Sequence, residues 1–409
     1  MTTTTTSAAY LDRYQDAVLG VFGRPAIVID HGQGCHVWDV DGRRYLDLLG
    51  GIAVNALGHG HPALVAAVSK QVAEVVHVSN FFTTPAQIAL AERLLDISGA
   101  PAGSKVFFAN SGTEAIEAAI KLARRTGRTG IVAAEGAFHG RTTGALALTH
   151  KPAYREPFEP LLPGVTHIPY ADAEALRAAV TPDTAAVVLE PIQGEGGVVA
   201  ADPAYLQAAR EIATAAGALL VIDEIQTGIG RTGQWFAFQQ SGILPDAITV
   251  AKGLGGGVPI GALITMGSEV SALLQPGQHG TTFGGNPLAA AAALAVLDTI
   301  DEQGLMAHAV ATGDHLADGV TALAHPLVST VRGRGLLRAI VLTEPIAPLL
   351  AGLARGAGFI INPVAPQAIR LAPPLVITTE EVDSFVSALP ELLDAAHAAY
   401  AAPNPPESS

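Results

Sequence analysis

The middle of the chain alternates short apolar segments with stretches of helical pattern. The apolar segments are continuous and lack polar alternation, which is typical of strands that are covered on both faces. They begin at residues 105, 129, 185, 218, 247 and 261 and read KVFFAN, TGIVAA, AAVVLEP, ALLVIDE, AITVAKG and GALITM. The pattern therefore predicts an α/β domain with a largely parallel central sheet.

A change of pattern near residue 305 indicates a second domain. The part before residue 305 alternates strands and helices: the helix that precedes the strand at 218 has Asp202 as its N-cap, Pro203 in its first turn and Gly217 after its end. Beyond residue 305 the chain continues as an amphipathic helix and short mixed strands. Because 409 residues exceed one ordinary core of about 250 to 300 residues, we expect two domains.

Composition narrows the classes of partner. Apolar residues make up 49% of the chain and charged residues 15%, which favours a subunit that buries further surface in an oligomer. The net charge of −14 argues against nucleic acid and anionic membranes, so we expect small-molecule partners. A single cysteine, Cys35, and the lack of a signal-like or membrane-spanning segment predict a cytoplasmic protein. Residues 1–8 and the tail AAPNPPESS are expected to be disordered.

Three of the predicted strands end in a charged residue: Glu190, Asp223 and Lys252. In such a sheet, ligands bind beyond the carboxyl ends of the strands, so these residues mark a candidate site. A strand ending in Asp-Glu, as in LLVIDE, also occurs at the magnesium site of P-loop ATPases. That class needs a G-x-x-x-x-G-K-[ST] loop, and the sequence contains none.

Lys252 is the strongest chemical signal. It is one of few lysines in the chain, and it stands between a buried strand and the glycine-rich GLGGGVPIG. A partly desolvated amine there has a lowered pKa that suits Schiff-base chemistry, although a lysine reaching from a strand end to solvent fits the same pattern. Asp223 then has a candidate partner, because a carboxylate keeps the pyridine nitrogen of pyridoxal phosphate protonated.

A phosphate site is predicted at the segment KVFFANSGTEAIEAAIK. It supplies a strand, a short polar loop and a helix, and it places Ser111, Gly112 and Thr113 where free N–H groups attract an anion. Ser111 and Glu114 also fit an ordinary helix cap, and the sequence leaves both interpretations open. Phe138, after the next strand, offers a face for stacking on an aromatic ring.

The chain resembles the class III, fold type I pyridoxal-phosphate aminotransferases, most closely the acetylornithine aminotransferases of arginine biosynthesis. The likeness runs from about residue 20 to residue 395. It rests on eight motifs in family order: GGIAVNALGHGHP, FFANSGTEAIEAAIK, FHGRT, EPIQGEGGV, LLVIDEIQTGIGRTG, AKGLGGGVPIGA, GTTFGGNPLAAAAALAVL and IRLAPPL.

The resemblance implies a fold and a domain organisation. The fold is α/β, with a large domain around a mainly parallel sheet and a smaller α+β domain built from both chain ends. On this chain we expect residues 1–60 to contribute to the small domain, residues 61–305 to form the large cofactor-binding domain, residues 306–400 to complete the small domain, and residues 401–409 to form a disordered tail.

The resemblance also implies a role for each matching residue around the cofactor. Lys252 carries pyridoxal phosphate through a Schiff base and moves the proton, Asp223 pairs with the pyridine nitrogen, and Gln226 approaches the phenolic oxygen. Phe138 and Ile225 enclose the ring.

The remaining implied roles concern the phosphate and the substrates. Ser111, Gly112 and Thr113 bind the phosphate together with Thr282 of the other subunit, which implies a homodimer with shared active sites. Arg141 binds the distal carboxylate of the substrate. Arg370 binds the α-carboxylate of glutamate or 2-oxoglutarate, and Glu195 covers Arg370 while an ω-amine donor is bound.

These roles predict an ω-aminotransferase that exchanges amino groups between N2-acetylornithine and 2-oxoglutarate. Succinylornithine, N-succinyl-diaminopimelate, ornithine and 4-aminobutyrate remain alternative donors, although Ile52, where ornithine enzymes carry a tyrosine, weakens ornithine. An aminomutase of the glutamate-1-semialdehyde type shares the scaffold, but it needs no receptor of the Arg370 kind. A cofactor-binding regulator is a further reading, without a recognisable DNA-binding segment to support it.

Two other features receive structural interpretations. His59 and His61 in GHGHP lack a nearby carboxylate or a third histidine at ligand spacing, so we expect no metal site. Glu224 points away from Asp223 if the strand continues, and we expect it to form a structural ion pair.

Overall fold

The computed structural model describes residues 6–402, so most of the two predicted disordered tails lie outside the described residues. Where they overlap, the first helix, α1 (Ser7–Ala17), begins inside the predicted N-terminal tail. The last helix, α14 (Thr379–Ala401), ends at the first residue of the predicted C-terminal tail. Both helical ends therefore extend slightly further than the sequence predicted.

A seven-stranded sheet forms the centre of the large domain, in the order β4-β12-β11-β10-β7-β5-β6. Only β12 runs antiparallel to its neighbours, which confirms the mainly parallel sheet. The strands in sheet order are Lys105–Ala109, Gly261–Thr265, Ala247–Val250, Leu219–Asp223, Thr184–Leu189, Gly130–Ala134 and Val165–Ile168. All six predicted strands are present, and the edge strand β6 is the one that the sequence missed.

The apolar strands are covered on both faces, as their lack of polar alternation predicted. Along β10, Leu220 and Ile222 pack into one hydrophobic core, whereas Val221 between them packs into the other. Helix α5 (Gly112–Arg124) contributes Ile116 to the second core, and α9 (Pro203–Ala216) contributes to the first. Helix α9 has the predicted boundaries, with the Asp202 side chain capping its start.

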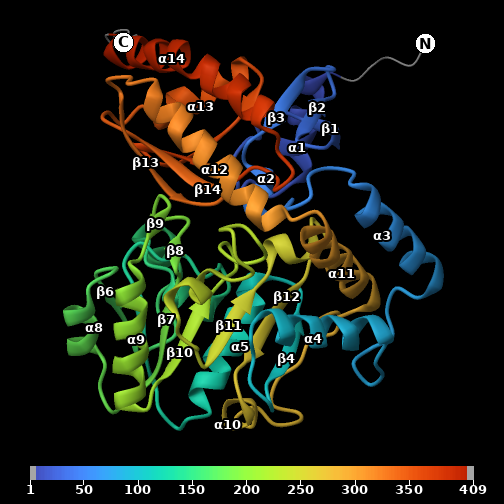
Figure 1. Cartoon of the computed structure of the whole chain (residues 1–409), viewed down its shortest axis with the longest axis vertical. Coiled ribbons are helices and arrows are strands. Elements are labelled where there is room, and N and C mark those ends of the chain that lie inside the picture. Colours follow the sequence, from blue (N-terminus) through green and yellow to red (C-terminus); the bar gives the residue numbers. More distant parts are fainter. Residues whose placement is uncertain (1–5, 403–409) are drawn as a thin grey trace.

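The other helices of this part of the chain lie before, between or after the strands, and Figure 1 shows several of them beside the sheet. They are α2 (Gly50–Ala53), α3 (Pro62–Glu74), α4 (Pro85–Ile97), α6 (Thr143–Leu148), α7 (Pro152–Arg155), α8 (Ala173–Ala179), α10 (Ser268–Ser271) and α11 (Pro287–Glu302). Three short 3₁₀ turns, at Glu156–Phe158, Ala237–Ser241 and Lys252–Gly255, and a small hairpin of β8 (Ile192–Gln193) and β9 (Val199–Ala200) complete the loops.

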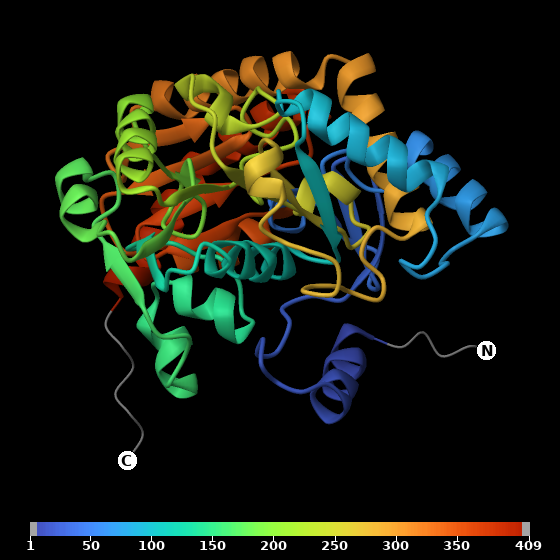
Figure 2. The same cartoon turned by 90° about the horizontal axis from the view of Figure 1, so that it is seen from below.

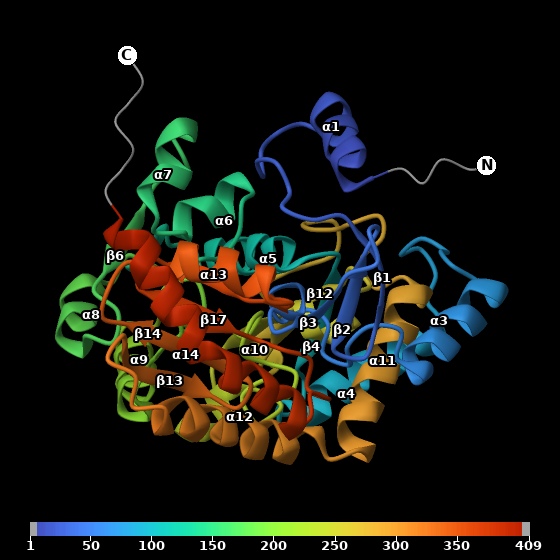
Figure 3. The same cartoon turned by 90° about the horizontal axis from the view of Figure 1, so that it is seen from above.

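The C-terminal part folds as a second layer above the first. A four-stranded sheet has the order β13-β14-β17-β16. Its strands are Val328–Arg334, Leu337–Leu342, Ala368–Leu371 and Asn362–Ala365, and its helices are α12 (Leu305–Ala322), α13 (Ala347–Gly356) and α14. Figure 3 shows α13 and α14 lying over this sheet. Strand β17 carries Arg370 and pairs with both β14 and β16, so this arginine is held in the middle of the sheet.

The two chain ends meet in a third sheet, of order β1-β2-β3-β15. Strands β1 (Ile29–Gln33), β2 (His36–Asp39) and β3 (Arg44–Asp47) come from the N-terminal segment, and β15 (Phe359–Ile360) pairs parallel with β3. This pairing supports the proposed division in which residues 1–60 join the C-terminal domain.

Helix α1 stands apart from the other elements when the molecule is seen from below (Figure 2), and it buries none of its residues. Within residues 6–402, no helix combines the length and the apolar character that crossing a membrane requires.

Candidate active site

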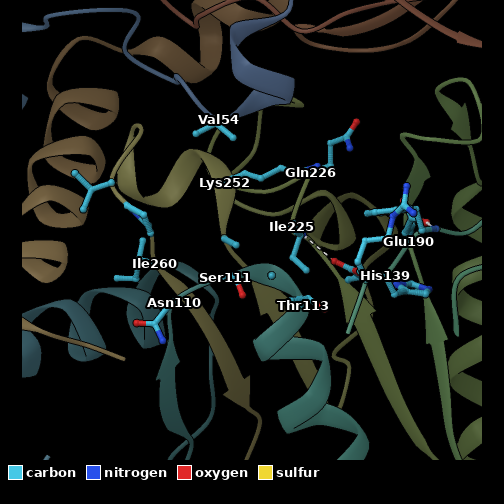
Figure 4. A pocket seen from close by; sticks show the side chains of 18 of the residues that line it. Val54, Asn110, Ser111, Thr113, His139, Glu190, Ile225, Gln226, Lys252 and Ile260 are labelled. Carbon is cyan, nitrogen blue, oxygen red and sulfur yellow. Dashed lines mark hydrogen bonds and ion pairs between the residues drawn. The ribbon is translucent and has the colours of Figure 1, made fainter. Parts of the chain in front are cut away.

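A cavity of about 440 Å³ lies where β10 and β11 end and α5 begins (Figure 4). It is the meeting point of side chains that are far apart in the sequence. The predicted residues that line it are Ser111, Gly112, Thr113, Phe138, Arg141, Asp223, Ile225, Gln226 and Lys252. Most of the predicted site residues therefore meet at the carboxyl ends of the central strands.

Lys252 lies at the bend between β11 and the following 3₁₀ turn. Its φ of +43° is in the left-handed region, which is uncommon for a residue with a Cβ and marks a constrained position. Burial, followed by the charge of Arg370, lowers the pKa of Lys252 to about 8, although nearby carboxylates oppose this shift. At pH 7 about a tenth of the amine is therefore neutral and nucleophilic, far more than for a lysine with an ordinary pKa.

Asp223 is held by a partner that the sequence did not reveal. His139 Nδ1 lies 2.7 Å from Asp223 Oδ2, and the Ile225 N–H donates to Oδ1 at 3.0 Å. Burial alone would lower the pKa of His139, but the hydrogen bond and the charge of Asp223 outweigh it and raise the pKa. His139 Nε2 is buried without a hydrogen-bond partner among the described residues. The histidine thus keeps the buried Asp223 carboxylate oriented.

His139 stands between two residues that were singled out, Phe138 and Arg141, in the motif FHGRT. Its position next to Phe138, a predicted cofactor residue, was the only sequence signal that it belongs to the site. Nothing local in the sequence indicates that it contacts Asp223, which lies 84 residues further along the chain.

Glu224 does not form the structural ion pair that the sequence led us to expect. Its carboxylate accepts hydrogen bonds from the Phe238 N–H at 2.8 Å and from the Thr227 hydroxyl, and no cation pairs with it among the described residues. Burial raises the pKa of Glu224 to about 7. The expectation was wrong because neighbouring backbone and hydroxyl donors satisfy the carboxylate at this position.

The start of α5 forms the candidate phosphate cradle. The Ser111 hydroxyl accepts from the Glu114 N–H at 3.3 Å, as in a helix cap, while the Glu114 carboxylate accepts from the N–H of Asn110 at 2.8 Å. In the described part of the chain, the N–H groups of Gly112 and Thr113 have no acceptor. The cap and the anion site are therefore compatible, because they use different N–H groups.

Two apolar side chains flank the space in front of Lys252. Ile225 packs so closely on the start of α5 that a Cβ at Gly112 would lie 2.7 Å from its side chain. Phe138 faces the same cavity, and the Arg141 guanidinium lies 5.7 Å from the centre of the Phe138 ring and 3.4 Å from that of Tyr154. Tyr154 was not predicted, and it fixes the position of Arg141.

A second cavity, of about 570 Å³, adjoins the first at Phe138 and contains Glu195 and Arg370. Arg370 is 1% exposed, and its Nη1 lies 2.5 Å from Glu195 Oε1 and 3.0 Å from Gln226 Oε1. Its Nη2 donates to Asn362 Oδ1 at 2.9 Å. Gln226 therefore connects the two cavities, and Ile52 lines the second one.

Thr282 is the one predicted site residue that neither of these two cavities includes. It lines a separate small pocket with residues of segment 77–87, whereas its neighbour Thr281 accepts a hydrogen bond from Asn110 at 2.9 Å. Within this chain Thr282 does not reach the start of α5, and its assignment to the site of a second subunit stays a prediction.

The histidine pair in GHGHP has a different setting from the one assumed. His59 Nε2 lies 2.9 Å from Asp47 Oδ2, so a carboxylate is close by. Within residues 6–402, no group of three or more metal-ligating side chains comes together.

The fold and the cavity together define a pyridoxal-phosphate-dependent transferase, and comparison with known proteins identifies the family. The sequence model of the class III aminotransferases matches residues 22–393, and the chain belongs to this family. An acetylornithine aminotransferase of Streptomyces coelicolor is 55% identical, over 94% of this chain and 95% of the relative.

Two solved structures have the same fold. A Toxoplasma gondii ornithine aminotransferase, with pyridoxal phosphate at partial occupancy in its active site, gives a TM-score of 0.90 at 31% identity and covers 97% of this chain. The matched region is 96% of that structure. An acetylornithine aminotransferase of Elizabethkingia anophelis gives a TM-score of 0.86 at 33% identity, covering 96% of this chain and all of that one (100%).

The residues of the first cavity fit pyridoxal phosphate. A partly buried amine, a buried carboxylate, two free N–H groups at a helix start and an apolar wall match its aldehyde, pyridine nitrogen, phosphate and ring. When bound, the cofactor supplies an electron sink for the carbon that loses its proton. In this fit, Lys252 Nζ would be the nucleophile toward the aldehyde and Asp223 would face the pyridine nitrogen.

Proposed function

We propose that the protein transfers the terminal amino group of N2-acetylornithine to 2-oxoglutarate, giving N-acetylglutamate 5-semialdehyde and glutamate. The observation that carries this proposal is the ion pair between Arg370 and Glu195 beside the amine of Lys252. An enzyme that accepts both an ω-amine and glutamate needs a carboxylate receptor that can be covered, and Arg370 has its cover within hydrogen-bond distance. The identity to acetylornithine aminotransferases over nearly the whole chain supports the same donor.

Each substrate group has a counterpart in the site. Arg141, steadied on Tyr154, binds the carboxylate of acetylornithine and the distal carboxylate of glutamate. Arg370 binds the α-carboxylate of glutamate once Glu195 moves aside. Lys252 Nζ removes the proton from the substrate carbon that bears the amino group and delivers it to the cofactor.

The cofactor groups are assigned to residues that line the first cavity. Asp223 holds the pyridine nitrogen, Gln226 lies near the phenolic oxygen, and Phe138 and Ile225 enclose the ring. Ser111, Gly112 and Thr113 bind the phosphate from the start of α5.

A homodimer with shared active sites is part of the proposal. Three phenylalanines near Thr282 are largely exposed in the single chain: Phe81, Phe82 and Phe283. Apolar patches of this kind mark protein–protein contacts, and a second copy of the chain covers them and brings its Thr282 to the phosphate. A role in arginine biosynthesis and a cytoplasmic location, consistent with the buried free thiol of Cys35, complete the proposal.

An aminomutase is the second candidate from another class of enzyme. It returns the amino group to the same molecule and has no use for a covered α-carboxylate receptor, so the Arg370–Glu195 pair favours the transferase. Other ω-amine donors would use the same Arg370–Glu195 pair, so only kinetic measurement distinguishes them from acetylornithine.

The test is a donor panel with purified protein and 2-oxoglutarate. N2-acetylornithine should give the highest kcat/KM, followed by its succinylated analogue, ornithine and 4-aminobutyrate, with glutamate formed in equal amount. A higher kcat/KM for any other donor would replace acetylornithine in the proposal. Conversion of glutamate 1-semialdehyde without 2-oxoglutarate would instead establish the aminomutase.

A further inference from the structure

A buried carboxylate that the proposed reaction does not use lies beside the cofactor cavity. Glu190 follows β7, lines the cavity next to His139 (Figure 4) and is 6% exposed. No cation pairs with it among the described residues. Instead, its Oε1 accepts from the N–H of Phe138 at 3.0 Å, and its Oε2 accepts from the N–H of Gly194 at 3.3 Å. One carboxylate thus joins two loops that come from different strands.

Each of these loops carries a residue of the proposed site. Phe138 is the wall that faces the cofactor ring, and Gly194 directly precedes Glu195, which covers Arg370. Gly194 packs directly against the side chain of Gln226, because a Cβ added at this position would lie 2.0 Å from Gln226 Oε1. That same Gln226 oxygen accepts from Arg370 at 3.0 Å. The loop of Glu195 is therefore held between Glu190 and the side chain that contacts Arg370.

The backbone of Glu190 is itself anchored. The Tyr170 hydroxyl lies 2.8 Å from the Glu190 carbonyl oxygen and 3.0 Å from that of Pro191, so it holds the strand end in place. Burial raises the pKa of Glu190 to about 7, although the charge of His139 and the two N–H donors oppose this shift. Burying a carboxylate that forms no salt bridge costs free energy, which an apolar side chain in its place would not cost.

We propose that Glu190 is a positioning residue that couples the wall over the cofactor ring to the cover of Arg370. By accepting from both N–H groups, it fixes Phe138 for stacking and sets the distance over which Glu195 reaches Arg370. This inference rests on the proposed function of Phe138 and Glu195. It assigns to Glu190 no contact with the substrate.

The experiment compares Glu190→Gln with a matched control, Glu224→Gln. The glutamine keeps the shape of the side chain but replaces one acceptor oxygen by an amide that cannot accept from N–H. Glu224 is an equally buried carboxylate at the end of the adjacent strand, accepting from the N–H of Phe238, and it does not line the described cavity. Both variants are loaded with cofactor and studied in the same way.

The first readout is hydrogen–deuterium exchange in peptides covering residues 136–140 and 192–197. Glu190→Gln should accelerate exchange in at least one of these segments, whereas Glu224→Gln should leave both at the wild-type rate. The second readout is cofactor affinity with the visible circular-dichroism band of the bound cofactor, which reports on stacking. Affinity should fall by about 10-fold or more, as for the loss of one hydrogen bond to a charged group.

The third readout is the ratio of the two half-reaction rates in single turnovers. Because Glu195 loses its fixed position, the preference for acetylornithine over glutamate should fall by about 10-fold in Glu190→Gln. Unchanged exchange in both segments, or equal changes in the control, would overturn the proposal. Glu190→Asp, too short to reach both loops, should show the same changes and serves if Glu190→Gln does not fold.

The exchange and affinity readouts do not depend on the donor. If wild-type protein failed with acetylornithine but Glu190→Gln still loosened both loops, the donor assignment would fail and the coupling would stand. If wild-type protein used acetylornithine and Glu190→Gln matched it in all three readouts, the coupling alone would fail.

Discussion

Arg370 Nη1 lies 2.5 Å from Oε1 of Glu195, so the receptor proposed for the α-carboxylate of glutamate is covered by a carboxylate of the same chain. Arg370 is almost fully buried, whereas the Glu195 side chain remains about one-third exposed (33%). Glu195 is thus the partner that can leave. An uncovered Arg370 would keep the side-chain oxygens of Gln226 and Asn362 as partners but would be a buried charge without a counter-charge while an ω-amine donor is bound.

Removal of Glu195 should therefore separate the two half-reactions. Glu195→Ala should leave the glutamate half-reaction intact or faster, and it should slow the acetylornithine half-reaction. A charged pair of about 1.5 to 3 kcal/mol corresponds to a change in preference of about 10- to 150-fold. Single-turnover kinetics of each half-reaction, followed by the colour change of the cofactor, measure this ratio. Equal slowing of both half-reactions would make Glu195 a structural residue only.

Lys252 should be the residue that carries the cofactor. Purified protein should be yellow, borohydride should fix the label on Lys252, and Lys252→Ala should abolish transamination. Label on any of the other lysines, Lys70, Lys105, Lys121 or Lys151, would refute the assignment.

The pH dependence of cofactor capture follows from the lowered pKa of Lys252. With a pKa of about 8, the amine is protonated and unreactive well below pH 8 and becomes neutral as the pH rises through that value. The rate at which apoprotein takes up the cofactor should therefore increase across this range and level off above it. Stopped-flow absorbance measures the rate, with Lys252→Ala as the control that shows no covalent capture. A midpoint near the ordinary lysine pKa would contradict the burial argument.

Asp223 should be required for both cofactor retention and turnover. Asp223→Ala removes the charged partner of the pyridine nitrogen and leaves His139 without its acceptor, with a loss of about 1.5 to 3 kcal/mol in binding. Equilibrium dialysis should show weaker cofactor binding, and turnover should nearly vanish because the transition state needs the charge most. His139→Asn, which leaves the carboxylate in place, should have a milder effect on both. Near-normal turnover of Asp223→Ala at saturating cofactor would remove Asp223 from its role.

The shared active site can be tested with hybrid dimers of Lys252→Ala and Thr282→Asp chains. If Thr282 serves the partner's phosphate, both defects fall on one site and the other site is wild type. The purified hybrid should then have about half of the wild-type activity, because one site of two is intact. If Thr282 served its own chain, each site would carry one defect and the hybrid would be inactive. Each parent homodimer, measured alone, provides the baseline.

The sequence by itself determined most strands of the central sheet and the charged residues at the ends of three of them. Continuous apolar segments predicted the buried strands because burial on both faces leaves no polar alternation, which is a local property. Lys252 and Asp223 stood out because each follows such a segment directly. The edge strand β6 escaped, since its VTHI mixes polar and apolar residues and it pairs with β5 alone.

Only the tertiary structure decided which side chains meet. Arg370 and Glu195 are separated by 175 residues, and their contact depends on how the C-terminal sheet sits on the central one. His139 reaches Asp223, and Glu190 reaches Phe138, because strand order in the sheet places β5, β7 and β10 side by side. Strand order and the direction in which side chains face arise from packing of the whole chain, so no local pattern encodes them.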